Sequence, residues 1–486
     1  MPERKDTTKL FPRAVDSKLK AWMETKERKP LILRGARQVG KTVAVGLFAQ
    51  HFDHFVSLNM DLAADAELFR RRLDVRDLYQ AILLKHRISA SSGKILLFLD
   101  EIQSCPEAVD SLRYFHEDLP DIFVVAAGSL LEIALHEKHI GFPVGRVAHM
   151  FMYPLSFREF LVATGAGPAI VAFDTVPFPA YAQPELLQLF HRYALIGGMP
   201  EIVAEYAKNR DLTALKPIYD SLLTSYLDDV SKYARNTTMA AVLRHCIETA
   251  PFVAGQRIAF AGFGKSNYRS REVGEALRTL QRAMLLHLLY PSVGVEIPIM
   301  PDLKKSPRLQ FLDTGLLNYF AGLQDEFFRH DDLHAIYKGM LAEHIVGQEL
   351  ICLEPNTRKK QCFWVRDKTQ SQAEVDFVIQ HRGYVIPVEV KSGTAGKLRS
   401  LHEFVDRCPH GYAVRLYAGP LELHPARTPT GKAYHLLNVP YFLASKVYKY
   451  VDWMMEQRGG MERPTEPSSD RAGLRFGEAE PTHLRD

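Results

Sequence analysis

The sequence has few of the features that assign a chain to a specialised class of protein. Its 486 residues include only five cysteines, which stand singly, with no Cys-x-x-Cys pair and no histidine at the spacing of a metal site. The longest apolar run, Ile122–Leu131, has ten residues and contains a glycine and a serine, so it is too short to cross a membrane. The formal net charge is only +4, from 61 Lys and Arg against 57 Asp and Glu. We therefore expect isolated thiols in a reducing compartment, no membrane span, and a local basic patch for any anionic partner.

The remaining composition is that of an ordinary globular chain. Apolar residues make up 47%, charged residues 24% and aromatic residues 10%, which excludes a wholly disordered or collagenous protein. The segment Met1–Lys20 is charged throughout and lacks the apolar core of a signal peptide, so we expect a cytoplasmic protein. At about 150 residues per domain, the length predicts roughly three domains.

Four short apolar runs in the first part of the chain predict a parallel α/β sheet. They lie at 31–33, 55–58, 95–99 and 122–126, separated by segments long enough for crossover helices. We expect this first domain to span residues 1–165. A stretch rich in Pro, Gly and Ala from Thr164 to Pro184 is typical of a loop or linker.

The later segments predict three further parts. Residues 185–325 form a helical and winged-helix region, in which Ser270 caps a helix and Leu285–Tyr290 turns at Pro291–Gly294 into a second extended segment. A second α/β module is expected at 335–455. Residues 459–486 are rich in Pro, Glu, Ser and Arg, and we expect a disordered tail there.

One glycine-rich motif carries a specific chemistry. Residues 35–42 match G-x-x-x-x-G-K-[ST], directly after the strand 31–33 and before a helical run through Phe48. In such a loop successive N–H groups face phosphate oxygens, the lysine contacts the β- and γ-phosphates, and the hydroxyl faces Mg²⁺. We predict a nucleotide site formed by Gly35, Ala36, Arg37, Gln38, Val39, Gly40, Lys41 and Thr42.

Two acidic residues follow the apolar run 95–99. The carboxyl end of a parallel strand faces the same crevice as the phosphate loop, so Asp100 is placed to hold Mg²⁺ and Glu101 to polarise an attacking water. An acidic strand end in solvent is common for one carboxylate, but it poorly explains two placed directly after five apolar residues. The pair predicts that bound ATP is hydrolysed.

Five motifs together resemble one known family. Besides the phosphate loop they are Leu-Asp-Glu-Ile-Gln at 99–103, Ala-Gly-Ser at 127–129, Pro-Leu-Ser-Phe-Arg-Glu-Phe at 154–160 and Gly-Gly-Met-Pro-Glu at 197–201. The combination is similar to the large prokaryotic family of AAA+ ATPases with a C-terminal DUF4143 region, and the likeness spans nearly the whole chain. It implies an AAA-type ATPase core, a helical part, a winged helix and a nuclease-like C-terminal module. It also implies that the motif at 197–201 contacts the lid over the nucleotide.

The likeness to ring-forming AAA+ ATPases implies two further roles. Ser129 resembles the first sensor, which contacts the attacking water or the γ-phosphate, but a turn serine or a helix cap explains it equally well. Arg146 is placed like an arginine finger that reaches a neighbouring subunit, although a single arginine is more often a surface residue or part of a salt bridge.

Carboxylates near the C-terminus form a second motif. In two predicted strands, 373–379 and 384–391, Asp376, Glu389 and Lys391 make D-x12-E-x-K. This resembles the PD-(D/E)XK nuclease core, in which two carboxylates hold Mg²⁺ and a lysine orients water. Glu343, in the helical run 340–350, matches the helix glutamate that some of those nucleases add. The alternative is an ordinary hairpin with these side chains on its exposed face, with Pro387 on an edge strand, in a binding or assembly module.

Arginines on the helix after Ser270 form a basic face. Arg271, Arg278 and Arg282 recur at i, i+7 and i+11, so they share one side of the helix and are spaced to follow nucleic-acid phosphates. Beyond the predicted wing, Lys304, Lys305 and Arg308 form a second basic cluster. A solvated charged face, or a winged helix packed on the ATPase, fits the pattern as well.

The sequence thus predicts an AAA+ ATPase that binds ATP and Mg²⁺ and hydrolyses ATP. We expect it to act on DNA or RNA through its C-terminal half, without a membrane, and to form a homo-oligomer. The alternative is a nucleotide-switched regulatory or interaction protein whose nuclease-like module does not cut.

Overall fold

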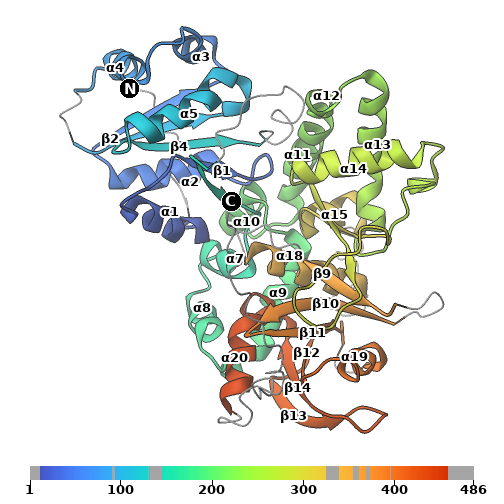
Figure 1. Cartoon of the computed structure of the whole chain (residues 1–486). Coiled ribbons are helices and arrows are strands. Elements are labelled where there is room, and N and C mark those ends of the chain that lie inside the picture. The colour runs from blue at the N-terminus through green and yellow to red at the C-terminus, as the bar shows by residue number, and fades with distance from the viewer. Residues whose placement is uncertain are drawn as a thin grey trace, which may run out of the picture.

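The computed structural model describes residues 11–89, 93–129, 131, 145–324, 339–353, 361–367, 373–393 and 396–457 (Figure 1). An N-terminal α/β part, a helical middle part and a C-terminal sheet follow one another along the chain (Figure 1). The tail predicted at 459–486 lies outside the described residues. Among the described residues, no helix combines the length and apolar character needed to cross a bilayer.

The N-terminal part is a parallel sheet with helices on both faces. Its strands are β1 (Leu31–Arg34), β2 (His54–Asn59), β3 (Ile95–Asp100), β4 (Phe123–Gly128) and β5 (Ala148–Phe151), in the order β2-β3-β4-β1-β5. Its helices are α1 (Ala14–Glu24), α2 (Lys41–Phe48), α3 (Ala63–Arg70), α4 (Val75–His86) and α5 (Pro106–Asp118). Alternate residues face opposite sides, so Leu31 and Leu33 pack with α1 and α2 whereas Ile32 packs with α3, α4 and α5. The predicted α/β fold of a P-loop ATPase core is confirmed.

The middle part is mainly helical. Its elements are α7 (Phe157–Ala163), α8 (Gly167–Asp174), α9 (Gln183–Ile196), α10 (Pro200–Asn209), α11 (Lys216–Asp228), α12 (Val230–Tyr233), α13 (Thr237–Val253), α14 (Ser270–Arg282), β6 (Leu286–Leu289), β7 (Pro291–Ser292), β8 (Arg308–Phe311) and α15 (Thr314–Phe320). The stretch 164–184, expected to be a loop, instead contains α8, because Pro168 suits the first turn of a helix and Phe173 is buried on its inner side. The predicted winged helix stays a prediction.

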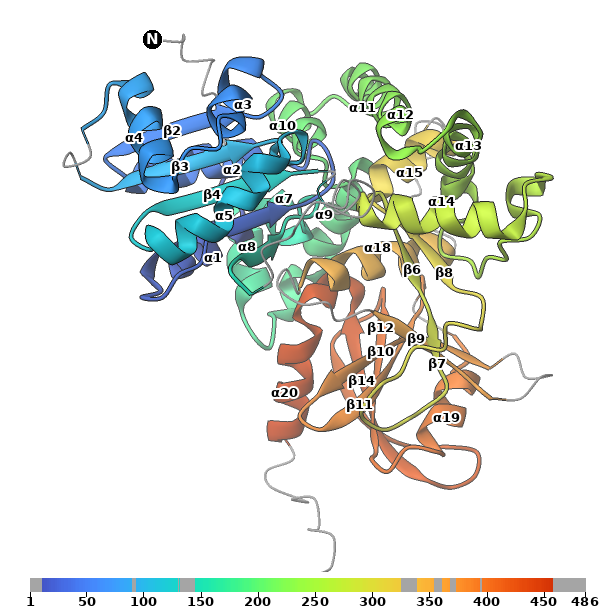
Figure 2. The same ribbon diagram turned by 45° about the horizontal axis from the view of Figure 1, so that its top comes forward.

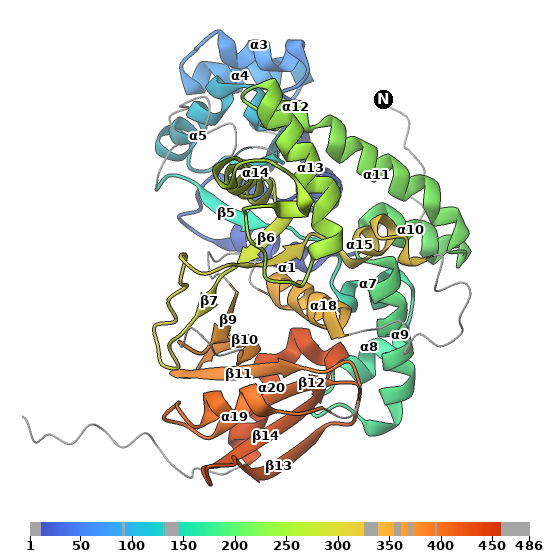
Figure 3. The ribbon, with the colours of Figure 1, turned by 90° about the vertical axis from the view of Figure 1, so that its right-hand side faces the viewer.

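Two local expectations in the middle part are wrong. Ser270 does not cap α14, because it is already the first helical residue, and the Glu272 carboxylate accepts a 3.0 Å hydrogen bond from the Arg269 N–H instead. The hairpin formed by the antiparallel strands β6 and β8 is not closed by a turn at 291–294. The connection continues to β8 at Arg308, and β7 within it pairs with a strand of the C-terminal sheet (Figure 2, Figure 3).

The C-terminal part is a mixed seven-stranded sheet in the order β13-β14-β12-β11-β10-β9-β7. Its own elements are α18 (Gly339–Cys352), β9 (Cys362–Val365), β10 (Glu374–His381), β11 (Tyr384–Val390), α19 (Arg399–Val405), β12 (Tyr412–Tyr417), β13 (Glu422–Arg427), β14 (Ala433–Pro440) and α20 (Val447–Gln457). The helices α18 and α20 pack on one face, and α19 packs on the other. Pro387 is not on an edge strand, since β11 lies between β10 and β12; it stands opposite Val378, and pairing with β12 begins only at Val388.

One hydrophobic cluster runs through all three parts. It includes Leu33 of the first sheet, Phe157 of α7, Leu316 of α15, and Ile345 of α18. The sheets are therefore joined by a continuous apolar core. Short 3-10 helices complete the architecture, at Ala49–His51, Ile102–Ser104, Ala180–Ala182, Thr213–Leu215, Phe263–Lys265 and Tyr441–Lys446.

Candidate functional site

The phosphate loop joins the end of β1 to the start of α2. Gln38 and Gly40 have φ angles of 63° and 92°, so the loop turns through the left-handed region that favours glycine. At Gly35 a Cβ atom would lie 2.4 Å from the carbonyl oxygen of Met152, which follows β5. Both glycines are therefore required for the loop to wrap closely against its neighbours.

Lys41 is buried at the first position of α2, with 8% of its surface exposed. Its ammonium group donates hydrogen bonds to the carbonyl oxygens of Gly35 at 3.0 Å and Ala36 at 2.9 Å. Burial lowers the pKa of Lys41 to about 8, while the nearby charges of Glu101 and Asp100 oppose the change. The side chain is thus held inside the curve of the loop, where a P-loop recognises phosphate.

The side chains of Thr42, Asp100 and Glu101 meet beside the loop. The Thr42 hydroxyl donates to Oδ2 of Asp100 at 2.8 Å, and Oδ1 of Asp100 accepts from the Glu101 N–H at 3.0 Å. Glu101 has a φ of 49° and accepts a 2.6 Å hydrogen bond from the side chain of Gln103. A hydroxyl and a carboxylate in contact are oxygen ligands of the kind that Mg²⁺ takes, so these residues fit the expected ion.

These side chains line a pocket of about 530 Å³, within the roughly 300–1,000 Å³ that is typical of small-molecule sites. The phosphate loop, Asp100 and Glu101 form its polar wall. Pro200 and Glu201, the last two residues of the motif at 197–201, line it as well. The motif therefore borders the pocket, and its contact with a lid over the nucleotide stays a prediction. The less polar walls include Phe11, Leu47 and Ala204.

Ser129 and Arg146 are outside the lining of this pocket. Ser129 follows β4 and is 8% exposed, next to Gly128, where a Cβ atom would lie 2.2 Å from Oε1 of Gln103. Arg146 is on the surface before β5, and its Nε is 3.0 Å from Oε1 of Glu117 on α5. Neither residue lines the 530 Å³ pocket. The sensor and arginine-finger roles stay predictions.

Arg13 is part of the site and has no motif that would reveal it. Its guanidinium donates to the carbonyl oxygens of Val39 in the phosphate loop at 3.0 Å and of Tyr153 at 2.8 Å, and to Oε1 of Glu159 at 2.8 Å. Burial would raise the pKa of Glu159, but Arg13 and backbone N–H donors outweigh burial and lower it. The only sequence signal is the capping box Ser156-x-x-Glu159, which predicts a helix start but not the ion pair.

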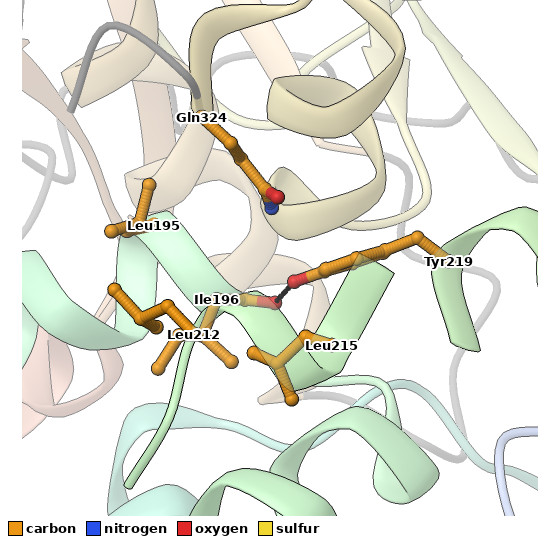
Figure 4. Close-up of a pocket in the computed structure, with 6 residues that line it drawn as sticks. All are labelled: Leu195, Ile196, Leu212, Leu215, Tyr219 and Gln324. Carbon is orange, nitrogen blue, oxygen red and sulfur yellow. Dashed lines mark hydrogen bonds between the residues drawn. The ribbon is translucent and has the colours of Figure 1, made fainter. Parts of the chain in front are cut away.

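The glycines of the 197–201 motif lie at a crossing, where two other segments of the chain, at Leu155 and at Asp313, pass close to the backbone. The Gly198 N–H donates to Oδ2 of Asp313 at 2.6 Å, and its carbonyl oxygen accepts from the Leu155 N–H at 2.6 Å. A Cβ atom at Gly198 would lie 2.2 Å from the Leu155 carbonyl oxygen. Figure 4 shows the small cavity beside this crossing, where the Tyr219 hydroxyl donates to the carbonyl oxygen of Ile196 at 2.6 Å. The chain just before Pro200 is thus anchored to Leu155 and Asp313, which precede α7 and α15.

A buried polar network continues from this crossing to α18. Oε1 of Glu349 accepts from the Phe157 N–H and lies 2.9 Å from the Tyr193 hydroxyl, and the Gln348 side chain donates to that hydroxyl at 3.0 Å. Burial raises the pKa of Glu349 to about 7 and that of Asp313 to about 6. The network links the helical middle part to α18 of the C-terminal part, and nothing local in the sequence indicates it.

The C-terminal carboxylates also come together, but they are buried. Asp376 is 7% exposed and Glu389 5%, so they do not form the exposed hairpin face of the alternative interpretation. The Lys391 ammonium lies 2.6 Å from Oε1 of Glu389. Burial raises the pKa of Glu343 to about 8 and that of Glu389 to about 7.

Two further charged residues, Arg308 and Glu374, complete this cluster. Neither belongs to the D-x12-E-x-K motif. Arg308 of β8 is 4% exposed and forms ion pairs with Glu374, Glu343 and Asp376. Arg308 is therefore not part of the surface basic cluster predicted with Lys304 and Lys305. Among the described residues, no group of three or more His, Cys, Asp or Glu side chains is placed to hold a metal ion. The cluster as folded does not fit the expected Mg²⁺.

The basic face of α14 is on the surface. Arg271 and Arg278 are exposed and Arg282 is half-buried. Within the described part of the chain none of the three forms an ion pair. Lys304 is exposed, and Lys305 lies 3.5 Å from Asp367. A local basic surface is therefore present on a chain of low net charge.

Comparisons with known families divide the chain into three segments. The AAA domain matches residues 27–161, a domain of unknown function, DUF8612, matches 187–326, and a second such domain, DUF4143, matches 338–428. No curated protein matches the chain.

Two solved structures are similar at low sequence identity. The Walker-type ATPase PABY2304 of Pyrococcus abyssi is 16% identical over 64% of this chain and 96% of its own, with a TM-score of 0.43. PCH-2 of C. elegans is 14% identical over 40% of this chain and 62% of its own, with a TM-score of 0.27. The family matches, with the phosphate loop and the pocket described above, support ATP binding and hydrolysis. The chain therefore combines an AAA domain with a DUF4143 region that follows it.

Proposed function

We propose that the protein binds ATP with Mg²⁺ and hydrolyses it. The observation that carries this proposal is the convergence of Lys41, Thr42, Asp100 and Glu101 on one pocket. Lys41 and the loop N–H groups bind the β- and γ-phosphates, and Thr42 and Asp100 hold the ion. When bound, Mg²⁺ neutralises negative charge on the phosphates. Glu101 accepts the proton of the attacking water.

Two substitutions separate binding from turnover. Lys41→Ala removes the charge that faces the phosphates, so we expect loss of ATP binding, measured with a fluorescent nucleotide. Glu101→Gln keeps the shape and removes the base, so binding should persist while phosphate release stops. The matched control is Glu107→Gln, an acidic residue of α5 that does not line the pocket. ATPase activity that survives in both site variants would refute the assignment.

We propose that ATP turnover is coupled to DNA or RNA through the basic face of α14. Support comes from the exposure of Arg271 and Arg278 and from their common side of the helix. Phosphate contacts release counterions, so binding should weaken steeply with salt. The α14 helix also packs against α13, which contacts α15 near the Asp313 crossing.

The test of coupling is the ATPase rate with and without DNA and RNA, together with binding at several salt concentrations. Replacing Arg271, Arg278 and Arg282 by Gln should abolish both binding and stimulation. The control is a triple variant in which Arg70, Arg71 and Arg76, in or beside α3 and α4, are replaced by Gln. It should leave nucleic-acid binding and the stimulation of the ATPase unchanged. Equal binding by the two triple variants would contradict the proposal.

A second candidate function is a nucleotide-switched interaction protein whose C-terminal module does not cut. It is favoured by the buried network from Asp313 to Glu349, which connects the pocket wall to α18 without passing through solvent. Slow ATPase activity that nucleic acid does not stimulate, with an oligomeric state that differs between ATP and ADP in light scattering, would support it.

A further inference from the structure

Arg308 lies inside the carboxylate cluster of the C-terminal sheet. Its Nη1 is 3.6 Å from Oε2 of Glu343 and donates to the backbone oxygen of Asp376 at 3.1 Å. Its Nη2 pairs with Oε1 of Glu374 and lies 3.7 Å from Oδ1 of Asp376. One guanidinium thus contacts three acidic side chains from α18 and β10, at 4% exposure.

The surroundings hold the guanidinium in this position. Its central carbon is 4.8 Å from the ring centre of Phe363 and 5.9 Å from that of Phe377, which are distances of cation–π contacts. Arg308 begins β8, and β8 pairs with β6 over four residues. The long connection between β6 and β8 adds β7 to the edge of the C-terminal sheet, beside β9 (Figure 3). The hairpin that carries Arg308 is therefore attached to the sheet by backbone pairing as well as by charge.

Arg308, Lys391 and a backbone N–H already engage one oxygen each of Glu374, Glu389 and Asp376. Oδ2 of Asp376 accepts the Val390 N–H at 2.7 Å, and its Oδ1 faces Arg308. Oε1 of Glu389 is bound to Lys391, and Oε2 of Glu389 is buried with no hydrogen-bond partner among the described residues. A break in the β9–β10 register between Val375 and Val378 turns Asp376 toward this cluster.

A divalent ion and this guanidinium cannot occupy the cluster together. Mg²⁺ requires carboxylate oxygens at about 2.0–2.1 Å in an octahedral shell, and it carries two charges that would face a buried cation. The guanidinium already supplies the positive charge that the carboxylates of Glu343, Glu374 and Asp376 need when they leave water.

We propose that Arg308 is the resident cation of this cluster and closes the nuclease-like module to divalent metal ions. The module as folded then does not cleave, and the arginine serves to lock the β6–β8 hairpin onto the C-terminal sheet. This inference concerns the second site alone and does not depend on whether the protein hydrolyses ATP.

Mn²⁺ binding to the full chain tests the proposal, with free Mn²⁺ measured by electron paramagnetic resonance. All variants carry Asp100→Asn, which removes the metal ligand of the phosphate-loop pocket. With Arg308 in place we expect no site of appreciable affinity. Arg308→Gln should create one Mn²⁺ site, so that this variant binds Mn²⁺ at least about tenfold more tightly than the protein that keeps Arg308. Adding Glu389→Gln should remove this site again.

The matched control is Arg257→Gln. Arg257 lies 3.8 Å from Glu374 but is half-exposed and does not contact Glu343 or Asp376, so its loss should create no site. If Arg308→Gln does not fold, the double variant Arg308→Gln with Glu374→Gln removes one positive and one negative charge and keeps Glu343, Asp376 and Glu389. Two results would overturn the proposal: a Mn²⁺ site that depends on Glu389 while Arg308 is present, or a folded Arg308 variant that gains no site.

Discussion

At the phosphate loop a lysine and two carboxylates border a pocket of about 530 Å³, whereas at the C-terminal sheet an arginine and its carboxylate partners pack against one another. Lys41 rests on backbone carbonyl oxygens, which an incoming phosphate can replace, and the carboxylate of Asp100 accepts hydrogen bonds from the hydroxyl of Thr42 and a neighbouring N–H. Arg308 is instead paired with three acidic side chains. The same residue types thus serve an open site in one place and a closed ionic lock in the other. The groups that contact the cation decide whether the site is open or closed: backbone carbonyl oxygens around Lys41, and carboxylates around Arg308.

The largest expected effect concerns the closed cluster. Arg308→Met leaves the buried Asp376 and the half-buried Glu343 and Glu374 without this counter-charge, and breaking a buried pair costs about 3–5 kcal/mol. Urea unfolding followed by tryptophan fluorescence, to which the buried Trp364 of β9 contributes, measures the loss. Arg257→Met, at a half-exposed position, should cost less than about 1 kcal/mol. Equal losses in the two variants would remove the distinction between the lock and an ordinary surface pair.

A substitution in the phosphate-loop pocket should change the ATPase activity and not the stability of the protein. Asp100→Asn keeps the side-chain volume but removes the charge that holds Mg²⁺, so we expect the ATPase rate to fall by roughly a hundredfold or more. The melting temperature should stay within about 2 °C, because Asp100 is half-exposed and the charge of Glu101 remains beside the buried Lys41. Steady-state phosphate release and thermal unfolding on the same sample check both statements. A large drop in melting temperature would make Asp100 a structural residue like Asp376.

Glu349 is another buried carboxylate, and within the described part of the chain it forms no salt bridge. Burial raises its pKa from 4.5 to about 7, so the folded protein binds a proton that the unfolded chain releases between these pH values. Stability should therefore decrease as the pH rises, by about 2 kcal/mol between pH 5 and pH 7. Among its titratable neighbours, Tyr193 has a pKa well above 10 and Glu159 has a lowered pKa.

Glu349→Gln keeps an acceptor oxygen for the Phe157 N–H and cannot ionise, so it should lose this part of the pH dependence. Denaturant unfolding of both proteins at pH 5, 6, 7 and 8 gives the difference directly. A stability difference between the two that does not change with pH would show that Glu349 stays charged.

The smallest effect is expected at the edge of the open site. Both guanidinium-to-carboxylate distances from Arg37 to Asp229 are short, 2.6 and 2.7 Å, and this pair ties the phosphate loop to the start of α12. Asp229→Asn should raise the KM for ATP about two- to fivefold with little change in kcat, because it loosens the loop without touching the reacting atoms. A fall in kcat alone would instead place Arg37 in the chemistry.

The features that sequence reasoning predicted well are local. The phosphate loop is contiguous, and its strand, turn and helix follow from apolar runs and glycines within about twenty residues. The features that it missed depend on long-range contacts: Arg13 meets Glu159 across 146 positions, and Arg308 meets the backbone of Asp376 across 68. Pro387 shows the same limit, since strand order, which no short segment specifies, placed it inside a sheet.

The sequence by itself determined the ATPase core, the strand ends that carry Asp100 and Glu101, and the identity of the D-x12-E-x-K residues, because periodicity and motif spacing are properties of neighbouring residues. Only the tertiary structure decided that Pro200 and Glu201 border the nucleotide pocket and that the second carboxylate set encloses Arg308. The physical reason is that a carboxylate's role depends on its counter-charge and its access to solvent. At both sites these are set by segments that lie far away in the chain.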